Sequence, residues 1–364
     1  MELAMLDIVV IGGGQAGLSA AYHLSRRGLV PERDFIVLDA NPGPGGAWRH
    51  RWPTLTLGAA HSIHDLPGMP LTSPDPSEPA AAVVERYYGG YEKEFGLPVH
   101  RPVRVQQVTS AGGGLPNSGE LPLLRVGTDR GSWRTRLVIN GTGTWDRPYW
   151  PHYPGRELFR GRELHTHDFC SVDDFRGQRV LVVGGGTSAV QFLLQLAGAG
   201  VQTAWSTRRP PEFTERPFDQ EWGREVEKRV RERTARGLPP GSVVSVTALP
   251  LTPVYRQGIA DGILVSRGPL ASITADGVQF ADGSTFAADA ILWATGFRAS
   301  LDHLAPLKLR EPGGGIIVED GVRVAKDPRV FLVGYGPSAS TLGATRAGRA
   351  AALAAIEALG VPAL

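Results

Sequence analysis

The first forty residues show a clear change in the spacing of their hydrophobic positions. The β-branched run at 8–11 predicts a buried strand, and from Leu18 onward apolar residues recur at helical spacing. Between them lies the turn Gly12-Gly13-Gly14-Gln15-Ala16-Gly17, with glycine at its first, third and sixth positions. This spacing suits a tight turn, a backbone that approaches a pyrophosphate, and close helix-to-strand packing. The segment therefore predicts a dinucleotide-binding unit, with an α/β turn that binds no ligand as the alternative.

A second apolar run, at 35–38, predicts the next strand, and Asp39 follows it directly. An acidic residue about 20 positions beyond the glycines is where such units hydrogen-bond an adenosine ribose. We therefore expect Asp39 to contact a ribose.

The rest of the chain alternates between strand and helix patterns. Residues 79–95 predict a packed helix with Glu92 on its polar face. Apolar segments at 103–108, 121–126 and 133–137 predict an antiparallel meander, and 137–140 predicts a buried strand that enters the glycine-rich segment 141–145. Further patterns predict a charged helix at 219–236, strands at 262–266, 270–274, 277–280, 290–297 and 330–336, and a C-terminal helix at 342–359.

The opening construction occurs a second time. An apolar run at 179–183 leads into Gly184-Gly185-Gly186-Thr187-Ser188-Ala189, after which apolar residues again recur at helical spacing. The following strand, 201–205, ends without an acid and is followed by Ser206-Thr207-Arg208-Arg209. A pair of guanidinium groups there suits the 2′-phosphate of NADPH. The alternative is two solvated arginines.

Composition narrows the possible classes of protein. The net charge of the 364 residues is +2, which gives no reason to expect a nucleic-acid partner or an anionic membrane. No apolar run approaches a membrane span and no secretory signal is visible, so we expect a cytoplasmic protein. Cys170 is the only cysteine, which excludes a disulfide framework or a Cys-x-x-Cys pair. His61 and His64 lack ligand partners at metal-binding spacing, so no metal is expected.

Together these residues resemble the class B flavoprotein monooxygenases, specifically the short bacterial members of the flavin-containing monooxygenase branch. The most specific match is Phe159 to Phe169, which fits the family pattern Phe-x-Gly-x-x-x-His-x-x-x-Tyr/Phe with His165 at the histidine position. The resemblance covers essentially the whole chain. It implies an α/β fold of two Rossmann-like domains, with an NADPH domain (151–293) inserted into an FAD domain (1–150 and 294–364).

The resemblance also implies which residues contact the cofactors. For FAD these are Gly12, Gly14, Gln15, Ala16, Gly17, Asp39, Ala40, Gly45, Gly46, Trp48, Thr142, Gly143 and Gly334. For NADPH they are Gly184, Gly186, Thr187, Ser188, Ala189, Ser206, Arg208 and Arg209, with Thr295 and Gly296 in a linker beside the nicotinamide. His165 is expected to have a structural or hinge role.

Two departures from the family pattern concern the reaction. Gly58 stands where longer members carry an asparagine beside the flavin, and the segment 334–337 has no aspartate for the ribityl chain. Trp52, Gly58 and His61 are candidate pocket residues. No side chain is expected to act as an essential acid or base.

The implied reaction consumes NADPH and O₂ and inserts one oxygen atom into a sulfur or nitrogen nucleophile of a small molecule, through a flavin C4a-(hydro)peroxide. Alternatives are an NADPH oxidase that releases H₂O₂ and a non-catalytic FAD/NADPH sensor. A disulfide reductase would need a second cysteine beside Cys170. The sequence leaves open whether the protein is a homodimer.

Overall fold

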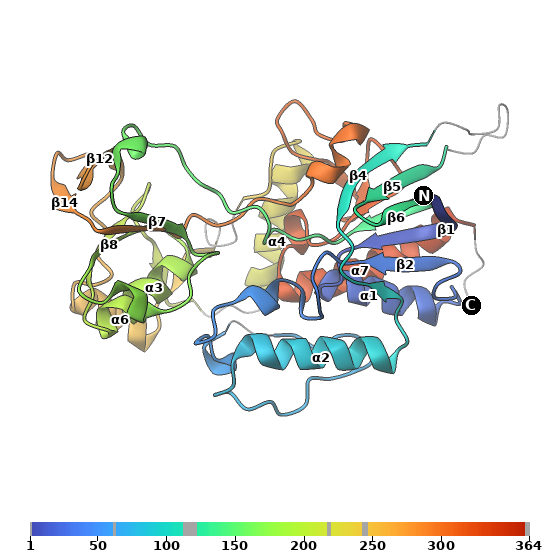
Figure 1. Cartoon of the computed structure of the whole chain (residues 1–364), viewed down its shortest axis with the longest axis horizontal. Coiled ribbons are helices and arrows are strands. Elements are labelled where there is room, and N and C mark those ends of the chain that lie inside the picture. Colours follow the sequence, from blue (N-terminus) through green and yellow to red (C-terminus); the bar gives the residue numbers. More distant parts are fainter. Residues whose placement is uncertain (1, 61–62, 112–121, 217–219, 242–246, 361–364) are drawn as a thin grey trace. The chain divides into compact units, whose positions relative to one another are not determined.

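The computed structural model describes residues 2–60, 63–111, 122–216, 220–241 and 247–360. The chain forms two compact units. Unit 1 comprises Met1–Asp146, Glu227–Pro240 and Ala299–Leu364, and unit 2 comprises Arg147–Val226 and Gly241–Arg298. Each unit is built around its own sheet (Figure 1).

The sheet of unit 1 has a parallel centre in which β1 (Glu2–Ile11) lies between β2 (Phe35–Leu38) and β6 (Gly131–Asn140). The next strand in sequence, β2, pairs on one side of β1, and the much later strand β6 pairs on the other. The carboxyl end of β1 is therefore a topological switch point, the place where open α/β sheets bind ligands. The sheet continues with β3 (Val99–His100), β16 (Val318–Glu319), β17 (Arg323–Val324) and β18 (Val330–Leu332), in the order β16-β17-β18-β6-β1-β2-β3. Beside this path β5 (Leu124–Thr128) pairs with β6, and β4 (Val105–Ser110) pairs with β5.

Side chains alternate between two cores on the faces of this sheet. Ile8 and Val10 belong to the core formed with α1 (Gln15–Arg26), α2 (Ala80–Glu94) and α7 (Thr341–Ala358). Val9 and Ile11 pack on the other face with β4, β5 and the 3-10 segment η5 (Asp302–Leu307). The helix α1 packs on β1 and β2, and α7 packs against α1 and against β6 and β18 (Figure 1).

Unit 2 contains a parallel sheet in the order β7-β15-β8-β9 and a separate antiparallel sheet, β12-β13-β14. The strand β8 leads into α3, which repeats the β1-to-α1 arrangement of unit 1. The bounds are β7 (Arg162–His165), β8 (Arg179–Val183), α3 (Thr187–Gly198), β9 (Gln202–Ser206), β10 (Phe213–Thr214), β11 (Leu249–Pro250), α6 (Pro253–Ala260), β12 (Leu270–Thr274), β13 (Gly277–Phe280), β14 (Thr285–Ala287) and β15 (Ala290–Trp293).

The unit bounds differ from the expected domain bounds of 1–150, 151–293 and 294–364. Unit 2 also takes in 147–150 and 294–298, because the two crossing segments are hydrogen-bonded: Arg298 N donates to Arg147 O at 2.8 Å and Tyr149 N to Gly296 O at 2.9 Å. Residues 227–240, which include most of α4 (Gln220–Ala235), belong to unit 1, where Gly315 N donates to Gly237 O at 2.9 Å.

Two predictions about elements were wrong. The segment 262–266 is not a strand, because Ile263 N and Leu264 N both donate to Gly258 O and close the end of the unpredicted helix α6. The apolar runs 133–137 and 137–140 form the single strand β6. The antiparallel meander itself is present as β4-β5-β6, although residues 112–121 lie outside the described part.

Candidate functional site

The glycine turn after β1 is shaped by close backbone contacts within unit 1. Gly12 has φ +102°, and a Cβ there would lie 2.5 Å from the carbonyl oxygen of Gly141. A Cβ on Gly17 would overlap the carbonyl oxygen of Gly12. These two glycines therefore serve the packing of the strand end against the start of α1.

Gly14 differs from its neighbours because one side of it is open. A Cβ on Gly14 would meet only the Cα of Gly46, at 3.9 Å. Gly45 and Gly46 both have positive φ, at 111° and 53°, and they bring this second glycine loop against the first. Gly14 is the N-cap of α1 and has no side-chain cap, so the helix N-terminus keeps N–H groups available beside it.

The other predicted FAD contacts of unit 1 have varied surroundings. Gln15 turns its amide toward α7, where Nε2 donates to Thr345 Oγ1 at 2.8 Å, and Ala16 is buried. Asp39, buried at the end of β2, is hydrogen-bonded to Asn41 and to Arg101, and Ala40 follows it. Gly334 has φ +70° just beyond β18.

The loop after β6 is held by a buried polar network. His303 Nε2 lies 2.6 Å from Asn140 Oδ1, Asn140 Nδ2 donates to Thr142 Oγ1 at 3.1 Å, and Thr142 Oγ1 donates to Ser300 O at 2.6 Å. Burial lowers the pKa of His303 to about 4, so its ring is neutral near pH 7 and Nε2–H donates. The network fixes Thr142, and Ser300 N also donates to Gly143 O at 2.9 Å; the family resemblance predicts Thr142 and Gly143 as FAD contacts.

An aromatic cluster flanks the loop that contains Trp48. The Arg51 guanidinium lies 4.8 Å from the ring centroid of Trp145 and 5.7 Å from that of Trp48. Burial lowers the pKa of Arg51. His50 stacks on Trp145 with centroids 5.8 Å apart, and its Nε2 lies 2.7 Å from Asn41 Oδ1. The guanidinium between two indoles is stabilised by cation–π interactions.

The three candidate pocket residues have different surroundings. Trp52 is buried, whereas Gly58 is exposed in the 3-10 segment η2 (Leu57–Ala59). A Cβ on Gly58 would lie 3.2 Å from both the Cβ and the carbonyl oxygen of Pro76. His61 lies outside the described residues.

The glycine turn of unit 2 also combines one tightly packed glycine with one that is open on one side. Gly184 has φ +141°, and a Cβ there would overlap the carbonyl oxygen of Ala294 at the end of the neighbouring strand β15. Around Gly186, the N-cap of α3, a Cβ would meet nothing within 4 Å. Thr187 and Ser188 form the first turn of α3, and Ala189 is buried.

The residues after β9 divide into buried hydroxyls and exposed cations. Ser206 is buried and its hydroxyl donates to Gly268 O at 2.9 Å, so this side chain is already engaged by the protein. Arg208 and Arg209 are exposed, and neither has an ion-pair partner among the residues that the structure describes. Two exposed positive charges thus lie at the carboxyl end of β9.

His165, at the end of β7, is fully buried and holds the linker at 294–298 in place. Burial lowers its pKa to about 4, so the ring is neutral. Because Nδ1 accepts the His167 backbone N–H at 3.1 Å, the proton is on Nε2, which donates to Gly296 O at 3.1 Å. Thr295 Oγ1 donates to Tyr149 O, which ties the same linker to the other crossing segment.

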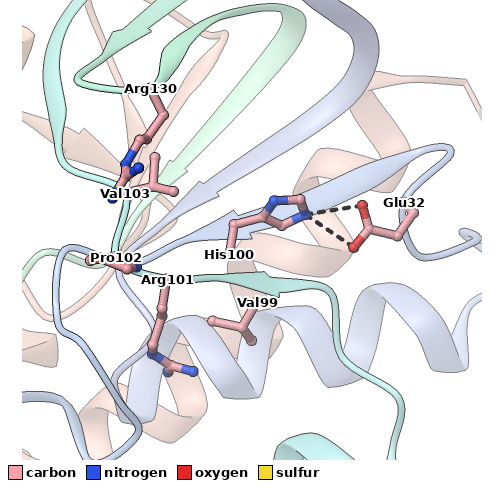
Figure 2. A pocket seen from close by; sticks show the side chains of 7 residues that line it. All are labelled: Glu32, Val99, His100, Arg101, Pro102, Val103 and Arg130. Atoms are coloured by element: carbon pink, nitrogen blue, oxygen red, sulfur yellow. Dashed lines mark hydrogen bonds and ion pairs between the residues drawn. The ribbon is translucent and has the colours of Figure 1, made fainter.

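A hollow of about 470 Å³ opens at the β3 edge of the unit 1 sheet and contains none of the residues of the glycine turns. Figure 2 shows His100 and Glu32 pointing toward one another across it, with His100 Nε2 3.0 Å from Glu32 Oε2. The Arg101 guanidinium points away from this pair (Figure 2). The hollow is lined by Glu32, Val99, His100, Arg101, Pro102, Val103 and Arg130.

Comparison with known proteins identifies the family. The model of the pyridine nucleotide-disulphide oxidoreductase family matches residues 9–242. A flavin-containing monooxygenase from Stenotrophomonas maltophilia is 36% identical, with a TM-score of 0.80, and the match covers 98% of this chain and 100% of that one.

The chain belongs to this family, in its flavin-containing monooxygenase branch.

Two further relatives are more distant. The indole-3-pyruvate monooxygenase YUCCA1 of Oryza sativa subsp. japonica is 25% identical over 86% of this chain and 81% of its own length. Senecionine N-oxygenase of Tyria jacobaeae is 24% identical over 52% of this chain and 44% of its own length.

Membership of this branch confirms the predicted family, the α/β fold with two Rossmann-like parts, and the prediction of a flavin monooxygenase. FAD and NADPH are the cofactors of this class. Among the described residues no helix is long and apolar enough to cross a membrane.

Sequence reasoning missed several residues that the structure brings to the first turn. Arg101, Asn41 and His303 belong to no motif. Asn41 lies two positions after Asp39, whereas Arg101 and His303 reach Asp39 and the β6 loop only through the folding of distant segments. Helical periodicity places Glu92 on the polar face of its helix, yet its side chain is only 13% exposed, because it pairs with Arg101.

Proposed function

We propose that this chain is an FAD-dependent, NADPH-consuming monooxygenase that transfers one oxygen atom from O₂ to a sulfur or nitrogen nucleophile of a small molecule. The observation that supports it most directly is the pair of glycine turns. Each has one glycine, Gly14 or Gly186, that is open toward the N-terminus of a helix.

The residues of unit 1 fit FAD. The turn leaves a cradle at Gly14 that an ordinary side chain would fill, and the N–H groups of α1 would bind the pyrophosphate there. Asp39 would accept a hydrogen bond from the adenosine ribose, and Gly45 and Gly46 would lie against the cofactor. FAD, when bound, supplies the redox and O₂ chemistry of the reaction.

The residues of unit 2 fit a nicotinamide dinucleotide. The first turn of α3, with Gly186, Thr187 and Ser188, would bind its pyrophosphate. The exposed guanidinium groups of Arg208 and Arg209 would bind a 2′-phosphate, and this favours NADPH over NADH. Ser206 would contribute through its backbone, because its hydroxyl is used by Gly268.

The protein itself contributes binding, orientation and exclusion of water. His165 is neutral and fully hydrogen-bonded, so it would hold the linker at Gly296 and would not transfer protons. The residues around the FAD site would have to exclude water, because access of water would divert turnover to H₂O₂. Nitrogen oxygenation by the relative from Tyria jacobaeae supports a heteroatom as the acceptor here.

The test is to measure NADPH consumption, oxygenated product and H₂O₂ together, using purified yellow protein and a panel of small thioethers and tertiary amines. Product formed in a substantial fraction of NADPH turnovers supports the proposal. Near-quantitative H₂O₂ with every compound in the panel would refute oxygenation and leave an NADPH oxidase. A colourless protein that cannot take up FAD would refute the FAD site itself.

One observation favours the oxidase as the second candidate: Gly58 offers no side chain at the position expected to carry an asparagine amide. Gly58→Asn should shift turnover from H₂O₂ to product if the missing amide limits coupling. Because any Cβ there meets Pro76 at 3.2 Å, Gly58→Ala is the matched control for the strain alone. Equal coupling in both variants would show that the amide has no role.

A further inference from the structure

Arg101 lies at the end of β3 and reaches across to the first glycine turn. Its Nε donates to Asp39 Oδ2 at 2.8 Å. Its two terminal nitrogens donate to Glu92, Nη1 to Oε2 at 2.6 Å and Nη2 to Oε1 at 2.8 Å. Nη2 also lies 3.5 Å from the carbonyl oxygen of Gly13. One guanidinium therefore links α2, the end of β2 and the glycine turn.

All three side chains of this group are largely removed from water. The exposed fractions are 10% for Arg101, 6% for Asp39 and 13% for Glu92. Burial alone would lower the pKa of Arg101, but its hydrogen bonds and the charges of Glu92 and Asp39 raise it. The two-pronged pairing with Glu92 fixes the plane of the guanidinium and leaves Nε directed at Asp39.

The acceptor positions of Asp39 can be counted. An ionised carboxylate offers about four, two on each oxygen. Oδ1 accepts from the backbone N and from Nδ2 of Asn41, at 3.2 and 3.1 Å, so both of its positions are used. Among the residues that the structure describes, only Arg101 Nε donates to Oδ2. One acceptor position on Oδ2 remains for a ligand.

Gly13 is part of the same arrangement. A Cβ on Gly13 would lie 2.6 Å from Arg101 Nη2 and 2.8 Å from Asp39 Oδ2. The dinucleotide pattern leaves this position variable. In this chain a side chain at position 13 would displace the Arg101–Asp39 pair, which occupies the space that it would need.

We propose that Arg101, held by Glu92, is a positioning residue that orients Asp39 so that its one free acceptor position receives a single hydroxyl of the adenosine ribose of FAD. The inference rests on the proposed FAD site and adds two statements to it. Ribose recognition depends on Arg101, and it uses only one of the 2′- and 3′-hydroxyls.

The experiment measures dissociation constants of the full-length chain for FAD and for FAD analogues whose adenosine ribose lacks the 2′- or the 3′-hydroxyl, from flavin fluorescence on dilution of the holoprotein. In the natural chain one analogue should bind about tenfold more weakly than FAD, because one charge-assisted hydrogen bond is lost. The other analogue should bind like FAD.

Arg101→Gln should raise the dissociation constant for FAD about tenfold. This variant should also bind FAD and the more weakly bound analogue with equal affinity. Arg101→Gln leaves the buried carboxylates of Asp39 and Glu92 without their cation. The double variant Arg101→Gln/Glu92→Gln removes one of these charges. It therefore tests the same loss of ribose recognition if the single variant folds poorly. Arg101→Lys should recover part of the discrimination. Arg104→Gln is the matched control, because that arginine pairs with Asp146 on the surface, where its side chain is 59% exposed.

The positioning role would be overturned if the Arg101 variants distinguished the analogues from FAD as strongly as the natural chain does. Equal weakening of both analogues in the natural chain would overturn the single-hydroxyl contact. A natural chain that binds no FAD would instead refute the proposed function, so the two failures are distinguishable.

Discussion

Replacing Gly14 by alanine should separate ligand binding from folding at the first glycine turn. Gly14 has φ −88° and ψ −171°, which alanine adopts without strain. Its Cβ would meet only the Cα of Gly46, at 3.9 Å. Reduced freedom of the unfolded chain would stabilise the variant by about 0.4–1 kcal/mol, and alanine as an N-cap would cost a similar amount. The free energy of unfolding without flavin should therefore change by less than about 1 kcal/mol.

The same methyl group would occupy the open side of the turn, where the FAD pyrophosphate is proposed to approach the backbone. Loss of two hydrogen bonds from N–H groups to the charged phosphates would cost about 3 kcal/mol, which corresponds to about a hundredfold in affinity. Urea unfolding of the flavin-free chain and fluorescence titration with FAD measure the two effects separately.

Gly12→Ala is the contrasting variant. Its Cβ would lie 2.5 Å from the Gly141 carbonyl oxygen at a φ of +102°, so backbone strain and overpacking together should destabilise the flavin-free chain by about 3 kcal/mol or more. The reasoning would be refuted if Gly14→Ala were destabilised as much as Gly12→Ala, or if Gly14→Ala bound FAD as tightly as the natural chain.

Three further predictions follow from the structure. Gly13→Ala should lower the affinity for FAD about tenfold, because the added methyl group displaces the Arg101–Asp39 pair. Fluorescence titration measures this affinity, and an unchanged value would contradict the prediction. The pKa of His165 is 6.5 in the unfolded chain and about 4 in the folded one, so its contribution to stability is complete above about pH 6.5 and lost as the pH falls toward 4. Urea unfolding should show a loss of about 2 kcal/mol from this group at pH 5, absent in His165→Gln, and an equal loss in both proteins would argue against a neutral histidine. Replacing Arg208 and Arg209 by alanine should raise KM for NADPH much more than for NADH in steady-state assays, whereas equal changes would show that both are merely solvated.

The sequence by itself determined the local elements that carry the cofactor sites. Both strand-turn-helix units could be recognised because the functions of their glycines are local: a positive φ at Gly12 and at Gly184, and an open approach at Gly14 and at Gly186. Hydrophobic periodicity likewise predicted α2 and the meander β4-β5-β6, because each buries one face of a short continuous segment.

Only the tertiary structure decided what surrounds these turns. Arg101 lies 62 positions from Asp39, and no spacing rule relates the two. Their pairing exists because β3 is placed next to β2 by the sheet order and because α2 brings Glu92 to the same point. The same reason explains Gly13, whose missing side chain makes room for a pair formed by two distant segments. Asp39, expected from sequence only as a ribose partner, thereby becomes a carboxylate with one acceptor position left.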